Sequence, residues 1–141
     1  MCIGGRDATS NEIVIKKHTD TNDIVFHTES PGSPFFVIKT EGKKAGEATI
    51  QETAIATASY SKAWKIGVSV TEVFWVTPDQ VSKQAPSGEY MPKGAFMIRG
   101  KRNYVPAVTQ LAIGIIKERI VIGAESAMSE YCKNIVKLCP G

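Results

Sequence analysis

Alternating apolar and polar residues predict a β-hairpin in the first third of the chain. In "DIVFHT" (23–28), Ile24 and Phe26 fall on one side of an extended chain, and Val25 and His27 fall on the other. "SPGS" (30–33) has the composition of a turn, and "FFVIK" (35–39) is rich in strand-forming residue types. We therefore expect antiparallel strands at 23–28 and 35–39.

Two segments carry helix signals. Residues 50–64, "IQETAIATASYSKAW", are alanine-rich and contain no glycine or proline, and Thr49 and Glu52 have the spacing of a capping box. Residues 11–18, "NEIVIKKH", are ambiguous, because Thr9 and Glu12 could cap a helix while the β-branched run favours a strand. The pattern predicts a helix at 50–64 and leaves 11–18 open.

The second half of the chain is mostly strand-like. Residues 67–78 are β-branched and aromatic, and the segments 95–106, 111–123 and 134–141 also suit strands. The connection at 79–94 contains two prolines and two glycines, and a loop this long is often functional. Residues 124–132 suit a short helix. The prediction is one α+β domain over 1–141, with a single mostly antiparallel sheet and two or three helices.

A basic segment interrupts the strand pattern at "FMIRGKR" (96–102). Period two places Phe96 and Ile98 on one face and Arg99 and Lys101 on the other. Between residues 83 and 104 one acid, Glu89, accompanies five cations, namely Lys83, Lys93, Arg99, Lys101 and Arg102. Tyr90, Tyr104 and Trp75 lie near in sequence and offer rings for stacking. Such a face suits single-stranded or looped RNA, and it also suits an edge strand protected by charge.

Composition restricts the remaining possibilities. The chain has 141 residues, a net charge of +3, and three cysteines with no C-x-x-C pair, so we expect free thiols and no disulfide framework. The sequence shows no secretion signal at its start and no apolar run of membrane-spanning length. We expect a cytoplasmic protein without a membrane anchor, and the pattern leaves its oligomeric state open.

Catalytic signals are weak. The "GGRD" turn (4–7) precedes a helix-start signal and could cradle a phosphate with Arg6, or it could be a tight turn with Arg6 paired to an acid. Asp7, Asp23 and His27 could converge, but a hairpin histidine bonded to its neighbours is the simpler interpretation. We expect no cofactor and no metal site.

Four stretches together resemble the NFACT-R domain, the RNA-binding module of ribosome-quality-control proteins. They are "GGRDATSNE", "DIVFHTESPGS", "YSKAW" and "QVSKQAPSGEYMPKGAFMIRGKRNY", in the family's order over 4–104, and the tail is similar to that of archaeal standalone forms. The resemblance implies a short helix at 11–18 and binding of RNA, with tRNA, rRNA or the large ribosomal subunit as partner. The N-terminal domain and coiled coil of larger members do not accompany it, so we do not expect this chain alone to tail nascent peptides.

Three functions follow in order of preference. The first is a non-enzymatic RNA-binding module; the second is an enzyme acting on RNA or a nucleotide through the "GGRD" loop and His27; the third is a protein-interaction module that docks on the ribosome or an NFACT partner. Combined with the basic segment, the resemblance gives as expected RNA contacts Arg6, Lys16, His27, Ser33, Lys62, Lys83, Tyr90, Lys93, Arg99, Lys101 and Arg102.

Overall fold

The computed structural model, described here for residues 1–86 and 88–141, is built around a five-stranded antiparallel sheet. The strand order is β1-β3-β2-β4-β7. In that order the strands are Cys2–Gly4, Phe36–Ile38, Ile24–Thr28, Val70–Val76 and Asn103–Val108. The β2–β3 hairpin confirms the prediction from alternation, with Val25 opposite Val37.

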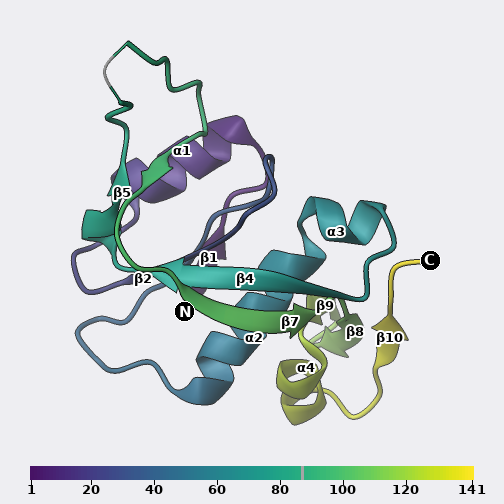
Figure 1. Cartoon of the computed structure of the whole chain (residues 1–141). Helices are drawn as coiled ribbons and strands as arrows, with labels where there is room; N and C mark the ends of the chain where they lie inside the picture. Colours follow the sequence, from purple (N-terminus) through teal and green to yellow (C-terminus); the bar gives the residue numbers. More distant parts are fainter. Residues whose placement is uncertain (87) are drawn as a thin grey trace.

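This sheet is apolar on both faces because helices cover both. Val25, Val37 and Phe74 pack with Val14 of α1 (Ala8–Lys17). On the opposite face, Phe26 and Val73 pack against α2 (Glu47–Ser59). Figure 1 shows the sheet lying between the two helices.

Helix α1 settles the ambiguity at 11–18 in favour of the helix. Its cap differs from the expected Thr9–Glu12 box: the Asp7 carboxylate accepts from the Ser10 N–H at 2.8 Å, and the Ser10 hydroxyl accepts from the Asp7 N–H at 3.0 Å. These bonds satisfy donors that the first helical turn leaves free. Glu12 is therefore available for contacts elsewhere.

The expected helix at 50–64 is divided in two. Helix α2 begins earlier, after Gly46, so the expected Thr49–Glu52 cap is wrong because Thr49 lies inside the helix. At the break, the Ser61 hydroxyl donates to the Ala58 carbonyl oxygen and accepts from the Ala63 N–H, which starts α3 (Lys62–Lys65). The buried Ala58 lets α2 lie close to the sheet, as its alanine content predicts.

The long connection contains more structure than expected. A 3₁₀ turn, η1 (Pro78–Gln80), leads into β5 (Val81–Ser82), which pairs with β6 (Met97–Ile98). The expected continuous strand at 95–106 is divided into β6 and β7. Gly100 lies between them with φ +76°, a left-handed conformation that interrupts strand pairing.

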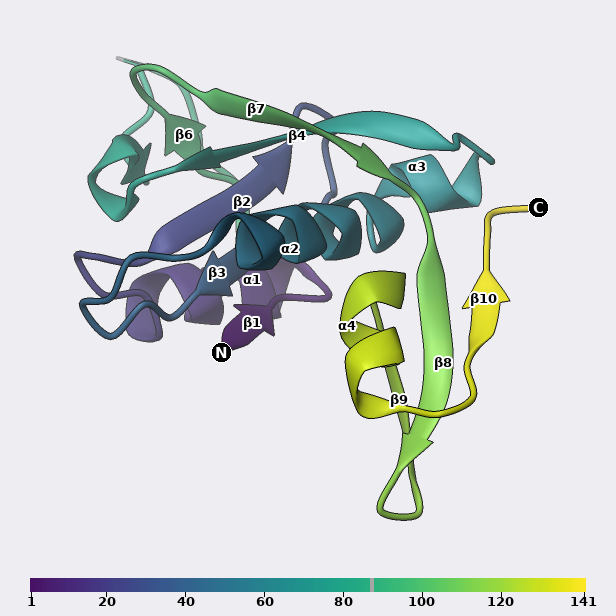
Figure 2. The ribbon, with the colours of Figure 1, turned by 90° about the horizontal axis from the view of Figure 1, so that it is seen from below.

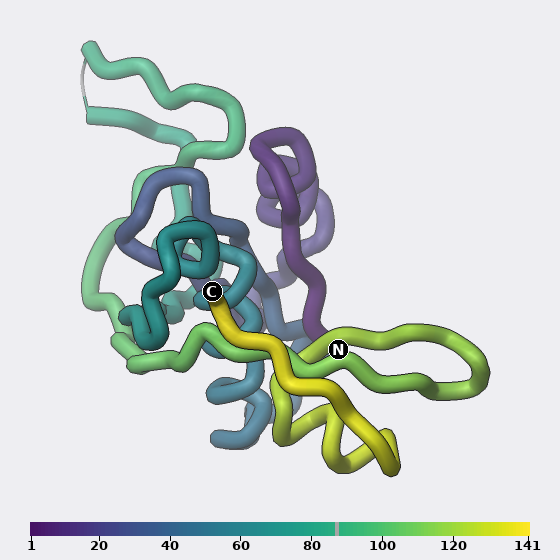
Figure 3. The backbone as a smooth tube through the Cα atoms, turned by 90° about the vertical axis from the view of Figure 1, so that its right-hand side faces the viewer, coloured from purple at the N-terminus to yellow at the C-terminus, as the bar shows by residue number. Residues whose placement is uncertain are grey.

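The C-terminal third forms a second sheet with the order β10-β8-β9. Its elements in chain order are β8 (Leu111–Ile116), β9 (Arg119–Gly123), α4 (Glu125–Tyr131) and β10 (Val136–Leu138). The expected strand at 111–123 is a hairpin, because Lys117 and Glu118 have φ 47° and 63° and reverse the chain. Figure 2 shows this hairpin projecting from the body, and Figure 3 shows the same projection from another side.

The α+β prediction is thus confirmed. The structure adds detail to it: the described residues form four α-helices, and the strands are distributed over three antiparallel sheets. None of the described helices is long and apolar enough to cross a bilayer.

Candidate nucleic-acid interface

Five aromatic side chains form a continuous row on the α1 side of the main sheet. His27, Phe74 and Tyr104 are register neighbours on β2, β4 and β7, so their side chains share one face. Phe35 stacks on His27 at 4.1 Å between centroids, and Phe96 meets Phe35 edge-on at 5.4 Å. We call this set the aromatic row. Tyr104 at one end is half exposed.

The other end of the aromatic row opens into a pocket of about 350 Å³, which we call the α1 pocket. Its walls come from the first turn of α1, the β2–β3 turn, the segment before β6, and the inner part of the aromatic row. The pocket brings together four of the predicted RNA contacts, which are Arg6, His27, Ser33 and Lys93. Residues far apart in the sequence therefore converge at one place.

The mouth of the α1 pocket is cationic. The Arg6 side chain is 93% exposed and makes a loose 3.5 Å contact with Asp7, which caps α1. Lys93 is exposed, and among the described residues its ammonium has no ion-pair partner. Two cations thus face solvent at a pocket with aromatic walls. Ser33, by contrast, is buried, and its hydroxyl contacts Thr28 inside the turn.

Glu12 fixes the long loop against α1. Its carboxylate accepts from Lys83 at 2.8 Å, from Lys16 at 2.5 Å and from the Gly94 N–H at 2.9 Å. Burial alone would raise the pKa of Glu12, but these hydrogen bonds lower it to about 2. Lys83 also donates to the Pro92 carbonyl oxygen at 3.0 Å. Lys83 and Lys16, two predicted RNA contacts, therefore have internal partners.

Arg102 is held by the Glu29 carboxylate and lies over the Phe74 ring of the aromatic row. One guanidinium nitrogen lies 2.5 and 2.6 Å from the two Glu29 oxygens, and the guanidinium carbon lies 4.7 Å from the Phe74 ring centroid. The Tyr104 hydroxyl donates to Glu29 at 2.7 Å. Hydrogen bonds from Arg102 and Tyr104 lower the pKa of Glu29. Arg102, which has the opposite parity to Arg99 and Lys101, is thus paired with an acid.

Arg99 and Lys101 remain exposed, as period two predicts. Phe96 and Ile98 pack against the core beneath them. The Gln80 amide donates to the Arg99 and Lys101 carbonyl oxygens at 2.7 and 2.8 Å, which fixes the turn at Gly100. Arg99 and Lys101 therefore lie one and three residues after Ile98, which lines the α1 pocket.

This chain is similar to a known protein family and to several known proteins. Residues 1–100 fit the family described as "NFACT protein RNA binding domain". The chain belongs to the NFACT RNA-binding domain family. Among curated relatives, the archaeal Rqc2 homolog aRqcH of Methanocaldococcus jannaschii is 49% identical over 118 residues, covering 83% of this chain and 18% of that protein. The human ribosome quality control complex subunit NEMF is 42% identical over 107 residues, covering 75% of this chain and 10% of that protein.

The domain is therefore a small part of the length of these relatives. A solved structure, the C-terminal part of the fibronectin/fibrinogen-binding protein from Streptococcus suis, has the same fold with a TM-score of 0.62. It is 17% identical and covers 75% of this chain and 39% of that one, so it supports the fold alone. The family match ends at residue 100, but β7 of this NFACT-R domain pairs with β4 and completes the sheet.

Three other aromatic or basic residues of this NFACT-R domain lie away from the α1 pocket. Tyr90 is 84% exposed in the long loop, where its ring is accessible. Lys62 is exposed at the start of α3, two residues after Tyr60, which lines the pocket edge. Trp75 packs on the α2 side of the sheet, so its ring faces away from the aromatic row.

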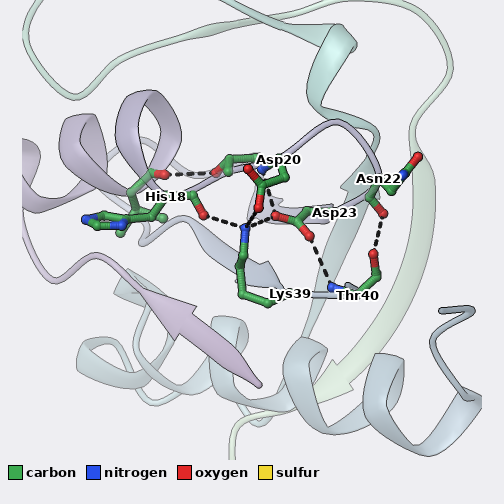
Figure 4. A network of polar contacts seen from close by, with 8 residues as sticks. His18, Asp20, Asn22, Asp23, Lys39 and Thr40 are labelled. Atoms are coloured by element: carbon green, nitrogen blue, oxygen red, sulfur yellow. Dashed lines mark hydrogen bonds and ion pairs between the residues drawn. The ribbon is translucent and has the colours of Figure 1, made fainter. Parts of the chain in front are cut away.

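Asp23 does not join His27 in a catalytic arrangement. Its carboxylate contacts the Lys39 ammonium and accepts from the Thr40 N–H at 3.1 Å, in the buried corner drawn in Figure 4. His27 places Nδ1 against the Thr28 carbonyl oxygen, and burial lowers the pKa of its ring. The structure thus gives Asp23 an architectural role and shows His27 as the hairpin histidine bonded to its neighbours.

The "GGRD" loop has already used its backbone donors. The Gly5 N–H donates to Phe35 at 2.9 Å, and the N–H groups of Arg6 and Asp7 donate to the Ser10 hydroxyl. Gly5 is required because an added Cβ would lie 2.2 Å from an Asn11 side-chain oxygen. The loop is therefore a tight turn that aims Arg6 outward, and these three donors are not available to cradle a phosphate.

Sequence reasoning missed two residues that shape the interface, Glu12 and Gln80. Glu12 has Lys16 four residues later, a spacing that signals a helical ion pair, but its contact with Gly94 joins residues far apart in sequence. Gln80 has no comparable local signal. Its partners at Arg99 and Lys101 lie about twenty residues away.

Proposed function

We propose that this NFACT-R domain is a non-catalytic RNA-binding module, acting as one unit over residues 1–141, that binds tRNA or rRNA in ribosome-associated quality control in the cytoplasm. The large ribosomal subunit is the proposed site of action. Family membership supports RNA as the ligand, and the ribosome-quality-control names of the relatives support the setting.

The observation that carries the proposal is the aromatic row with exposed cations beside it. Phe35 and Phe74 are buried, so the ring surface of the row that can stack with bases belongs to Tyr104, His27 and Phe96. Exposed cations beside these rings can neutralise phosphates. The exposed cations in position to do so are Arg6, Lys93, Arg99 and Lys101, of which Arg6 makes a loose 3.5 Å contact with Asp7. Lys83 and Arg102 are held more closely by Glu12 and Glu29.

A salt titration tests the proposal. If four cations each neutralise one phosphate of a single-stranded region, the logarithm of RNA affinity should fall with the logarithm of salt at a slope of about −2.8. Fluorescence anisotropy with labelled tRNA over a range of KCl concentrations measures this slope. Binding that does not change with salt would contradict a phosphate-binding surface.

The double variant Arg99→Gln/Lys101→Gln should weaken tRNA binding by about fivefold and make the salt slope shallower by about 1.4. Lys43→Gln/Lys44→Gln is the matched control, because both lysines are exposed and lie in the loop at the other end of the β2–β3 hairpin from the α1 pocket. Equal losses in the two variants would show that net charge alone governs binding.

The proposal that the module is non-catalytic is supported by the contacts of the two candidate carboxylates, since Asp7 caps α1 and Asp23 pairs with Lys39. Incubation with a tRNA panel should leave every RNA intact. Nuclease treatment separates RNA binding from docking on a ribosomal protein: ribosome association should disappear after RNA digestion, and association that survives would favour protein contact.

A further inference from the structure

We infer that the α1 pocket holds a single unpaired nucleotide of the bound RNA, with its base against the inner aromatic row and its phosphate between Arg6 and Lys93. This inference rests on the proposed function and specifies the ligand of one part of the surface. It makes the module selective for RNA in which a base is free to leave its stack.

The size of the α1 pocket suits a single nucleotide. The α1 pocket, at about 350 Å³, lies near the lower end of the range of about 300–1,000 Å³ found for small-molecule sites. That volume suits one base with part of its sugar and excludes a base pair. A nucleotide paired in a helix cannot enter, because its base edge and both faces are already covered.

The second argument is the chemistry of the walls. The half-buried Phe96 supplies apolar ring surface to the wall. Phe35 is 2% exposed, and the His27 ring stacks on it within the same wall. His27 Nδ1 lies against the Thr28 carbonyl oxygen, and the ring also has a backbone hydrogen bond with Ser33, so its polar atoms are engaged within the hairpin. A flat ring such as a nucleobase matches these apolar and aromatic walls.

The third argument is the distribution of charge at the mouth. Arg6 precedes α1, and Lys93 lies in the loop before β6, where the next residue, Gly94, lies against Ala8 in the first turn of α1. Asp7, the acid at this mouth, has one oxygen bonded to the Ser10 N–H and hydroxyl groups at 2.8 and 2.9 Å, and its other oxygen lies 3.5 Å from Arg6 Nε. A phosphate would therefore meet Lys93, which has no ion-pair partner among the described residues, and the 93% exposed Arg6, whose contact with Asp7 is loose.

The fourth argument is that the walls are fixed before any ligand arrives. The Asn11 side chain accepts from the Phe35 N–H at 3.1 Å and donates to the Ser33 carbonyl oxygen at 3.4 Å, which holds the β2–β3 turn. Glu12 holds Gly94 on the opposite wall. A preformed site loses less conformational entropy when it binds than a mobile loop would.

The test compares two RNAs of identical sequence, a single strand of about 12 nucleotides and its perfect duplex, by fluorescence anisotropy. The wild-type protein should bind the single strand about tenfold more tightly. Arg6→Gln/Lys93→Gln should reduce single-strand affinity by about fivefold and leave duplex affinity within about twofold. Lys43→Gln/Lys44→Gln should affect both RNAs equally and weakly.

Ala95→Leu fills the pocket without changing charge, since Ala95 is a half-buried wall residue. It should remove the single-strand preference, and a thermal melt should show that the variant is folded. AMP should shift the amide NMR signals of His27 and Gly94, and inorganic phosphate at the same concentration should not.

Each contrary outcome has a distinct meaning. RNA binding without a strand preference, or a preference that survives in folded Ala95→Leu, overturns the nucleotide pocket and leaves the RNA-binding proposal standing. Equal shifts with AMP and phosphate reduce the pocket to an anion site and also overturn the inference. Failure of the wild-type protein to bind either RNA overturns the proposed function itself.

Discussion

The two ends of the β2–β3 hairpin treat charge in opposite ways. At the end where β2 begins and β3 finishes, Asp23 and Lys39 are paired and largely shielded, and Lys39 also contacts the Asp20 carboxylate at 2.8 Å (Figure 4). At the turn end, the α1 pocket exposes Arg6 and Lys93 beside apolar walls. Closely paired, shielded charges hold the strands together. The exposed charges, Lys93 without an ion-pair partner among the described residues and Arg6 with its loose contact to Asp7, are available to a ligand.

The same division runs through the basic segment. Counting from 83 to 104 gives five cations, but Lys83 and Arg102 are bound to Glu12 and Glu29. Only part of the positive charge that the sequence concentrates here can therefore neutralise RNA. Substitutions that move one residue from the paired group to the unpaired group test this comparison most directly.

The largest effect is expected at the shielded end. Asp23→Ala leaves the Lys39 ammonium without its buried partner, and breaking a buried ion pair from one side costs about 3–5 kcal/mol. Chemical denaturation should show a loss of that size in the free energy of unfolding. The RNA affinity of the folded fraction should stay within about twofold of wild type, since Asp23 lies away from the α1 pocket.

Asp20→Ala is the matched control, because the Asp20 side chain is 84% exposed although it contacts the same ammonium. A surface pair of this kind is worth at most about 1 kcal/mol. Similar losses in the two variants would mean that burial does not distinguish them, and a large loss of RNA affinity in folded Asp23→Ala would contradict the division between the two ends.

The second-largest effect is expected at Glu12, where one substitution should lower both the stability of the fold and the affinity for RNA. Glu12→Gln weakens the charged hydrogen bonds to Lys16, Lys83 and Gly94, and should cost about 1.5–3 kcal/mol of unfolding free energy. The wall that carries Lys93 should then become mobile. Single-strand RNA affinity should fall about threefold, although removing an acid would by itself favour RNA. Tighter binding would show that Glu12 does not position the loop.

Acid titration identifies the origin of that loss. The folded pKa of Glu12 is about 2, below its usual value of 4.5, so its carboxylate contributes stability above pH 4.5 that is lost as the pH falls toward 2. The difference in unfolding free energy between wild type and Glu12→Gln should therefore be constant near neutral pH and shrink below pH 4.5. A difference that persists at pH 2 would assign the effect to packing.

Sequence patterns predicted the helices and strands better than they predicted which side chains contact each other across the fold. Alternation located the β2–β3 hairpin, and period two placed Phe96 and Ile98 on the core side, because both signals depend on neighbouring residues. The division of 95–106 at Gly100 escaped the pattern, since it depends on Gln80 binding the turn from a distant segment. Likewise, a count of cations could not show that Lys83 and Arg102 have acidic partners from other elements.

The smallest effect should appear at the far end of the aromatic row. Glu29→Gln releases Arg102 from its carboxylate while the Phe74 ring still supports the guanidinium. Arg102 then becomes available to a phosphate, so RNA affinity should rise about twofold to threefold and the salt slope should steepen by about 0.7. Arg102→Gln/Glu29→Gln, which removes both charges, is the control and should show neither change. An unchanged slope in Glu29→Gln would mean that RNA does not reach this end of the row, and the interface would then be confined to the α1 pocket and the Arg99–Lys101 turn.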